Sequence, residues 1–288
     1  MNNAFGRVII KVIMKEIDKI NKAYKYLSRI YAKPIDTILV LGSGLGALAG
    51  EVDDAIVVSC RDIPYIKTST TPYHDGKLVL GMISGKSVAV MSGRVHLYED
   101  ITPNDVVRLI RVLSLMGAKR IVLTNSAGAI NREYKVGDVV AIRDHVSLFV
   151  PSSLTGDIRR EIGDKLNFVD MSEVYDSNYL GLLDKIAKEQ NLDLKTGVYV
   201  QLSGAQYETP SEIRLLDKLG CDLVGMSTVI ESIASRHLGL KIVAFSIITN
   251  MASGIEKVKL SHEEVKIVAN KTGEKLKSII KKLLEKID

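Results

Sequence analysis

Arg94 and His96 are the side chains in this sequence best suited to hold a small anion. They follow the apolar run 88–91 and lie two residues apart, so in an extended chain both point to the same face. Arginine supplies a fork of N–H donors and histidine supplies one more. A second source of donors is Gly42-Ser-Gly-Leu-Gly46, which follows another apolar run and can offer backbone N–H groups with the Ser43 hydroxyl. These residues predict a cradle for an anion such as phosphate.

Two further serines extend this hypothesis. Ser126 follows a buried run and could contribute its backbone N–H, and Ser227 could contribute its hydroxyl at a helix start, where the helix dipole favours negative charge. Taken alone, the glycine tract is as typical of a tight turn as of a phosphate-binding loop. The pair of Arg94 and His96, taken alone, is more typical of a surface ion pair. A dinucleotide fingerprint is not favoured, because the third glycine falls at the wrong spacing and no acidic residue follows a clear second strand.

A second group of polar residues could recognise a flat heterocycle. Asn250 ends a strongly apolar run, where an unpaired buried amide would cost about 1–3 kcal/mol. Glu208 offers a carboxylate acceptor and Tyr207 a ring face, so that the three residues suit the edge and face of a planar base. Alternatives remain open: Glu208 precedes a helix cap, Tyr207 could be a core tyrosine, and His262 could be an exposed residue at a helix start.

Six apolar runs each end at one of these polar or glycine-rich tracts, at residues 37–41, 88–91, 121–123, 198–202, 221–224 and 242–248. Short β-rich runs without alternation are typical of strands that are buried on both faces of a sheet. In open α/β sheets the ligand lies beyond the carboxyl ends of the strands. We therefore expect the polar groups at these six ends to meet in one pocket.

Helices are expected between these strands. An amphipathic pattern predicts a helix over residues 14–31. Capping signals predict further helix starts at Thr102, Thr209, Thr228 and Ser261. Residues 77–83 and 86–91 should pair as a hairpin around Ser84-Gly85, and residues 151–176 are typical of a long loop.

This alternation of strands and helices predicts an α/β fold. We expect a single-domain, three-layer-like architecture in which a central mixed β-sheet is surrounded by helices. Residues 14–288 would form the domain, and residues 1–13 would be an N-terminal extension.

Bulk composition narrows the class of protein. The chain has 288 residues, of which 46% are apolar and 25% charged, as in an ordinary soluble enzyme. Its net charge of +5 comes largely from lysines expected on solvated faces of the terminal helices, so no nucleic-acid partner is predicted. Cys60 and Cys221 form no metal-binding spacing, which favours a reducing, cytoplasmic setting without zinc or disulfides. No apolar stretch reaches the length of a membrane span, so no membrane association is expected.

The sequence resembles the trimeric purine nucleoside phosphorylases from about residue 36 to 285. The motifs that carry this resemblance occur in the family's order and spacing: Gly42-Ser-Gly-Leu-Gly46, Ser92-Gly-Arg-Val-His-Leu-Tyr-Glu99, Thr124-Asn-Ser-Ala-Gly128, Tyr207-Glu-Thr-Pro210, Val224-Gly-Met-Ser-Thr228 and Ser246-Ile-Ile-Thr-Asn250. The resemblance implies a nucleoside phosphorylase fold and a pentosyltransferase of purine salvage. Such an enzyme reversibly cleaves 6-oxopurine (deoxy)ribonucleosides, such as inosine and guanosine, to the base and (deoxy)ribose 1-phosphate. It implies inorganic phosphate as co-substrate, no metal or organic cofactor, and a homotrimer.

The same resemblance assigns roles to individual positions. The phosphate site would comprise Ser43, Arg94, His96, Ser126 and Ser227, with His74 at its edge. Ribose would meet Tyr98, Tyr199, Met226 and His262. The base would meet Tyr207, Glu208 and Asn250. Within these sets, Asn250, Glu208 and His96 would be catalytic, with Asn250 stabilising the negative charge that develops at N7 and O6 and Glu208 accepting the N1–H.

Several positions depart from the family's usual residues. Ala205 and Ile230 stand where proline is common, and Ile162 falls near an aromatic residue that many members send into the neighbouring subunit's sugar site. Two residues are missing between Asn250 and His262. The alternatives are a 5′-methylthioadenosine phosphorylase, which would need an aspartate at position 250, and a non-catalytic nucleoside-binding protein, which would not need Arg94 and His96.

Overall fold

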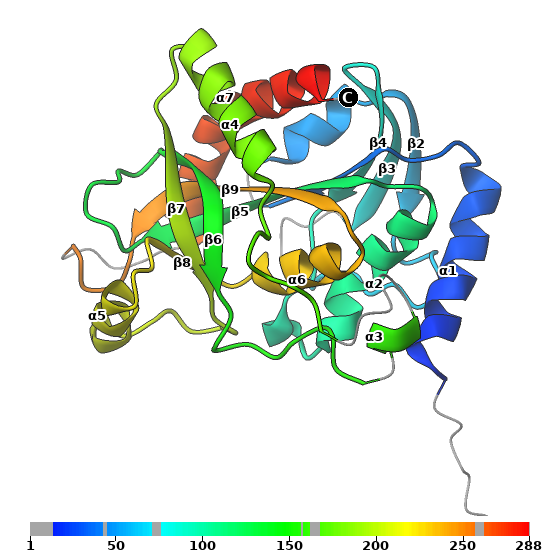
Figure 1. Ribbon diagram of the computed structural model, residues 1–288, viewed down its shortest axis with the longest axis horizontal. Coiled ribbons are helices and arrows are strands. Elements are labelled where there is room, and N and C mark those ends of the chain that lie inside the picture. The colour runs from blue at the N-terminus through cyan, green and yellow to red at the C-terminus, as the bar shows by residue number, and fades with distance from the viewer. Residues whose placement is uncertain are drawn as a thin grey trace, which may run out of the picture.

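The structure is a computed structural model that describes residues 14–42, 45–70, 76–156, 158–161, 168–256 and 262–287. Figure 1 shows a sheet running through the molecule with helices packed on both of its faces. Its strands are β1 (Thr37–Leu41), β2 (Asp53–Ser59), β3 (Lys77–Ile83), β4 (Lys86–Ser92), β5 (Arg120–Ala129), β6 (Val139–Val146), β7 (Leu194–Gln201), β8 (Leu223–Gly225) and β9 (Lys241–Met251). Its α-helices are α1 (Glu16–Ile30), α2 (Pro103–Leu115), α3 (Ile158–Glu161), α4 (Ser177–Glu189), α5 (Pro210–Lys218), α6 (Val229–His237) and α7 (His262–Lys286).

The strands form one mixed sheet in the order β2-β3-β4-β1-β5-β8-β7-β6-β9, and β9 also pairs with β5. Five strands, β5, β8, β7, β6 and β9, therefore close on themselves into a small barrel. The mixed sheet agrees with the sequence prediction, whereas the closure is an additional feature that the apolar runs did not reveal. Strand β1 pairs in parallel with both β4 and β5, and β5 also pairs in parallel with β9, whereas β8 runs antiparallel to β5.

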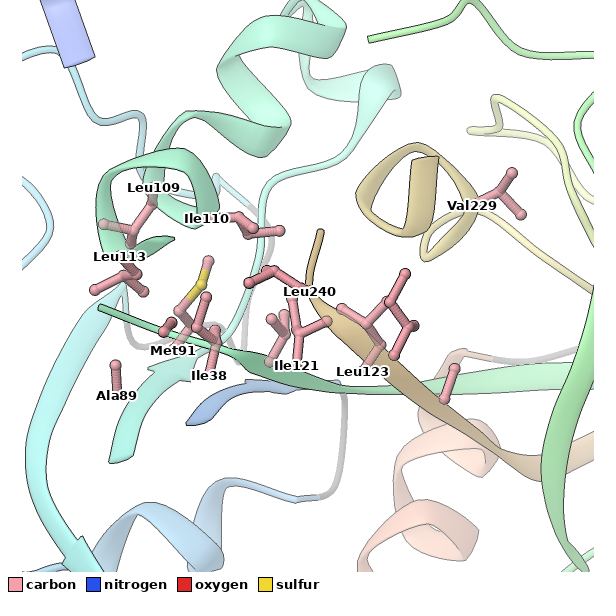
Figure 2. Close-up of a cluster of buried hydrophobic side chains, with 14 of the residues drawn as sticks. Ile38, Ala89, Met91, Leu109, Ile110, Leu113, Ile121, Leu123, Val229 and Leu240 are labelled. Carbon is pink, nitrogen blue, oxygen red and sulfur yellow. The ribbon is translucent and has the colours of Figure 1, made fainter. Parts of the chain in front are cut away.

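Strand β1 illustrates how the sheet separates two helical layers. All five of its residues are buried, as the lack of polar alternation predicted. Ile38 and Val40 pack in the cluster that includes residues of α1, α2 and α6, while Leu39 and Leu41 pack in the cluster that includes α4 and α7. Figure 2 shows the first of these clusters, where side chains of α2 face those of the strands.

Local signals fixed several element boundaries correctly. Thr102 caps α2 by accepting the Asp105 N–H at 3.2 Å, and Pro103 is the first helical residue. Thr209 caps α5 in the same way. The hairpin of β3 and β4 turns at Ser84 and Gly85, where both residues have positive φ, as a two-residue turn requires.

Other elements were not anticipated. Strands β2 and β6 and helix α4 were not recognised in the sequence. Within the described part of residues 151–176, the chain is irregular except for the short helix α3, which agrees with the expected long loop. The predictions for residues 1–13, Ile162 and the Ser261 cap lie outside the described residues.

Candidate active site

A cavity of about 360 Å³ lies where the strand ends meet. Each of the six predicted tracts contributes to its wall, and the lining residues that carry chemistry are Arg94, His96, Tyr98, Ser126, Tyr207, Glu208, Met226, Ser227 and Asn250. The remaining lining residues are Gly42, Asn125, Ala127, Gly128, Ala205, Val224, Gly225 and Thr249. The expectation that these polar groups share one pocket is therefore confirmed.

The sheet topology explains this convergence. Strands β1, β4, β5 and β9 share one direction, so their carboxyl ends lie at the same edge. Strand β8 runs the other way, but it pairs with the last residues of β5, so that Val224 lies opposite Gly128. The barrel closure thus brings β8 and its neighbour β7 to the edge where the parallel strands end, which the rule for open sheets does not cover (Figure 1).

A glycine is required where β1 reaches this edge. A Cβ at Gly42 would lie 2.7 Å from the Thr124 carbonyl oxygen and 2.9 Å from the Asn125 Cα. The Gly42 N–H donates to the Thr124 hydroxyl at 2.9 Å. The first residue of the predicted glycine tract therefore serves a close approach between backbones. Ser43, the tract's candidate phosphate ligand, lies outside the described residues.

Arg94 is held by partners within the chain. Its Nη1 donates to the Thr228 hydroxyl at 3.1 Å and to the Glu231 carboxylate at 3.3 Å. Its Nη2 donates to the carbonyl oxygens of Val40, at 3.3 Å, and of Thr124. Arg94 and Glu231 form an ion pair whose side chains are 3% and 2% exposed. Arg94 lines the cavity as expected, but Glu231 compensates its charge, which the sequence did not predict.

His96 is oriented by Glu99. The His96 Nδ1 lies 3.1 Å from the Glu99 carboxylate, and its ring stacks on Tyr98 with centroids 4.8 Å apart. Since a carboxylate only accepts hydrogen bonds, Nδ1 carries the proton that Glu99 accepts, which fixes the orientation of the ring. Burial would raise the pKa of Glu99, but hydrogen bonds from His96 and Thr70 outweigh it and hold that pKa well below the ordinary value. Glu99 also accepts from Ser69, so it ties the segment before residue 71 to His96.

Ser227 stands at the entrance to α6, beside a fully buried network. The Thr228 hydroxyl accepts from Arg94 and, at 2.9 Å, from the Asn125 amide, and it lies 3.3 Å from the Ser227 hydroxyl. With both of its lone pairs engaged, Thr228 donates its own proton to Ser227. The Asn125 carbonyl oxygen in turn accepts from Ser246 at 2.7 Å. This network therefore fixes the position of the Ser227 hydroxyl.

Thr228 also adopts an unusual backbone conformation, with φ of +83°. For a β-branched residue this region is strained, at a cost of about 1–3 kcal/mol. Such strain persists only where the surroundings hold the residue firmly. The buried bonds to its hydroxyl, together with the bond from its N–H to Glu231, supply that support.

Two other predicted residues have contrasting positions. Ser126 lines the cavity, but its hydroxyl is buried and has no hydrogen-bond partner among the described residues. Tyr199 differs from the expected ribose contact, because it is fully buried and does not line the cavity. A Cβ at Gly225 would lie 2.3 Å from its hydroxyl, so Tyr199 packs behind Gly225, and burial raises its pKa.

The predicted base-binding residues lie together at the cavity. Glu208 is 9% exposed, and burial raises the pKa of its carboxyl group, with a smaller contribution from Glu212. Asn250 donates from Nδ2 to the Met251 carbonyl oxygen at 3.0 Å, and its Oδ1 accepts from the Thr249 hydroxyl at 3.0 Å. The carbonyl partner fixes the orientation of the amide, because a carbonyl cannot donate. One N–H and one lone pair of Asn250 remain for a ligand.

The predicted ribose contacts Tyr98 and Met226 meet at Gly204. A Cβ at Gly204 would lie 2.6 Å from the Met226 sulfur and 2.8 Å from the Tyr98 ring, and Gly204 has φ of +75°. Glycine is therefore needed there for both space and backbone conformation. The two side chains enclose one part of the cavity, as a sugar-binding wall would.

Besides Ser43, two further expected site residues cannot be placed. His74 lies outside the described residues, and only the backbone of His262, as the first residue of α7, is described. Among the residues that the structure describes, no group of three or more His, Cys, Asp or Glu side chains could hold a metal ion. Within the same residues, none of the helices is long and apolar enough to cross a membrane.

Comparison with known proteins identifies the family. A family model described as the phosphorylase superfamily matches residues 36–285. The chain belongs to this superfamily, and its relatives narrow the assignment. It is 38% identical over 267 residues to "Purine nucleoside phosphorylase 1" of Bacillus subtilis, covering 93% of this chain and 98% of that protein. It is 36% identical over 256 residues to the purine nucleoside phosphorylase of Bos taurus, covering 86% and 88%.

Solved structures agree with this assignment. A schistosoma purine nucleoside phosphorylase in complex with hypoxanthine superimposes with a TM-score of 0.89 at 34% identity, covering 96% of this chain and 100% of that chain. The Schistosoma mansoni enzyme in complex with adenosine also gives a TM-score of 0.89, covering 94% and 98%. Within the superfamily the chain thus belongs to the purine nucleoside phosphorylases, and it is an enzyme of the pentosyltransferase class, as its sequence motifs indicated.

Proposed function

We propose that this enzyme catalyses the reversible phosphorolysis of 6-oxopurine (deoxy)ribonucleosides, such as inosine and guanosine, to the free base and (deoxy)ribose 1-phosphate. One observation carries the proposal: the side chains assigned to the anion and those assigned to the base line the same cavity. A nucleoside and a phosphate that react with each other must be held side by side. The proposed reaction needs no cofactor other than inorganic phosphate as co-substrate.

On the phosphate side, the polar groups are fixed before a ligand arrives. The His96 ring is held by Glu99, the Ser227 hydroxyl lies beside that of Thr228, and Ser126 would contribute its backbone N–H. Arg94 stands behind them, paired with Glu231. Such preorganised donors would hold the phosphate dianion beneath the sugar, where it stabilises the oxocarbenium character that develops and then attacks C1′. Ser43 and His74 remain proposed contacts.

On the base side, Asn250 and Glu208 have complementary roles. As the C1′–N9 bond breaks, electrons move onto the purine and the basicity of N7 and O6 rises. The remaining N–H of Asn250 would donate to the edge that carries N7 and O6 and so stabilise this negative charge. Glu208 would accept the N1–H that hypoxanthine and guanine carry and adenine lacks. Tyr207 would pack against the base, and Tyr98, Met226 and His262 against the ribose.

A second substrate class deserves a direct test. One similar solved structure is described as a complex with adenosine, a 6-aminopurine nucleoside. A 5′-methylthioadenosine phosphorylase would need a group that accepts from the 6-amino group, which an aspartate would supply at position 250. The asparagine found there supports the 6-oxopurine preference. The homotrimer and the cytoplasmic location stay proposals, which rest on the family resemblance and on the cysteine content.

The test is product analysis with inosine, guanosine, adenosine and 5′-methylthioadenosine, each with and without phosphate. We expect hypoxanthine and ribose 1-phosphate from inosine only when phosphate is present, and much slower cleavage of the two adenine nucleosides. Similar kcat/KM for inosine and adenosine would contradict the preference. Nucleoside binding without any phosphate-dependent cleavage would contradict the reaction and favour a binding protein.

A further inference from the structure

The segment from Gly225 to Thr228 leaves β8, forms part of the cavity wall and enters α6. Gly225, Met226 and Ser227 all line the cavity, and the proposed function gives Met226 a sugar contact and Ser227 a phosphate contact. Thr228 follows with its positive φ. The positions of both contacts therefore depend on how the start of α6 is held.

The first N–H groups of a helix have no partners within the helix, and the N-cap side chain usually accepts one of them. Here the Thr228 hydroxyl is occupied by Arg94 and Asn125. Gln201 takes over this role from another strand. Its Oε1 accepts the N–H of Val229 at 2.9 Å and the N–H of Ile230 at 3.1 Å.

Gln201 reaches both sides of the cavity-lining segment. It is the last residue of β7, is 2% exposed, and pairs in register with Gly225. While its Oε1 holds the first turn of α6, its Nε2 lies 3.5 Å from the Met226 carbonyl oxygen. The side chain thus spans the segment that carries Met226 and Ser227, although it does not itself line the cavity.

We propose that Gln201 is a positioning residue of the reaction: by holding the first turn of α6 from β7, it sets the places of Met226 and Ser227 in the cavity. The proposal rests on the proposed function, because it is that function which gives these two residues their ligands. Misplacing a contacting group by about 1 Å can reduce rate about 100-fold. Gln201 would act without touching substrate.

Gln201→Met tests this role, because methionine matches the side chain in length but removes both the acceptor and the donor. We expect kcat/KM for phosphate to fall about 10- to 100-fold when it is measured well below the Tm of the variant. Ser235→Ala is the matched control. Ser235 is also fully buried and bonds the Glu231 carbonyl oxygen within α6 at 2.7 Å, so its loss should lower Tm and leave kcat/KM unchanged.

Ile230→Pro provides an independent arm. Proline lacks the N–H that Gln201 accepts, it is tolerated in the first turn of a helix, and it is the residue common at this position in the family. In the Ile230→Pro background, Gln201 therefore accepts only the N–H of Val229 and no longer that of residue 230. Gln201→Met should therefore reduce kcat/KM several-fold less than it does in the wild-type background. Equal reductions in the two backgrounds would contradict the proposed contact.

Amide hydrogen exchange at Val229 and Ile230 gives a readout that needs no turnover. Gln201→Met should accelerate exchange at both amides, whereas Ser235→Ala should not. A lower Tm with unchanged kcat/KM, or unchanged exchange at these amides, would overturn the proposal. If the wild-type enzyme cleaves no nucleoside, the proposed function fails instead, and exchange together with the affinity for inorganic phosphate decides whether Gln201 positions the segment.

Discussion

Glu208→Gln changes the pairing of the purine N1 position while preserving the shape of the side chain. Glu208 is almost buried, so its carboxylate would meet the N1–H of inosine with little competition from water. A hydrogen bond to a charged group contributes about 1.5–3 kcal/mol. Because 1.4 kcal/mol corresponds to a factor of ten, the variant should lose about 10- to 100-fold in kcat/KM for inosine.

Adenosine should respond in the opposite direction. Its N1 carries a lone pair and no proton, so it faces a carboxylate that cannot donate in the wild-type enzyme. Glutamine can donate its amide N–H to that nitrogen. The ratio of kcat/KM for inosine to kcat/KM for adenosine should therefore decrease by a larger factor than kcat/KM for inosine does. Coupled assays of both nucleosides would measure the two values.

The matched control is Glu212→Gln, four residues along the same segment. Glu212 closes the capping box of α5 with Thr209, and glutamine can fill the same position. Its kinetics should match the wild type. A loss of less than about threefold for inosine in Glu208→Gln, or an equal loss in both variants, would refute the assigned role of Glu208.

The pH dependence tests the same carboxylate. Burial raises the pKa of Glu208 above 4.5, so the ionised, accepting form is lost at a higher pH than for an exposed glutamate. As pH falls through this raised pKa, KM for inosine should increase. Glu208→Gln should lack this limb, while the titration of phosphate itself remains in both enzymes and serves as the internal reference.

Three other substitutions probe the remaining groups. Asn250→Asp should raise kcat/KM for adenosine relative to inosine, because a carboxylate accepts from the 6-amino group; an unchanged ratio in the nucleoside assay would exclude that role. Glu99→Ala should raise KM for phosphate about tenfold by releasing the His96 ring, and phosphate titrations that match the wild type would show that His96 needs no such support. Glu231→Gln should lower stability by about 3 kcal/mol in thermal unfolding, because Arg94 loses its buried ionic partner, yet it should decrease KM for phosphate since the arginine charge is no longer compensated. A stable variant with an unchanged KM would contradict both expectations.

Much of the fold was predictable because local chemistry decides it. The Thr102 and Thr209 caps satisfy first-turn N–H groups, so their helices start where the sequence indicates. Strand β1 was recognised because all its residues are buried. Strand β2 was missed although residues 55–58 form a short apolar run; it lies at the edge of the sheet, where Ile56 and Val57 stay exposed. The closure of β5 on β9 depends on pairing between distant strands, which no short pattern encodes.

The site was predictable as a set of residues and less so as a set of contacts. Spacing alone indicated that Arg94 could reach an anion, but it could not show that Glu231, from a helix far along the chain, would compensate its charge. Glu99 was part of a motif, yet only the short turn after His96 brings its carboxylate to the ring. Tyr199 illustrates the converse. The family resemblance assigned it a ribose contact, but in the fold it packs behind Gly225 and does not line the cavity.

Three of the assigned contacts at the cavity have a partner behind them that fixes their orientation. Glu99 holds His96, Thr228 holds Ser227, and the Met251 carbonyl oxygen fixes the amide of Asn250. These partners lie in strand ends and first helical turns, where buried polar groups must be satisfied in any case. In the proposed reaction the folding requirement and the catalytic requirement would therefore coincide, because the hydrogen bonds that stabilise the strand ends also orient the groups assigned to the ligand. A reaction without a nucleophilic side chain depends on such fixed dipoles, because they need not reorganise as charge moves from the sugar to the base.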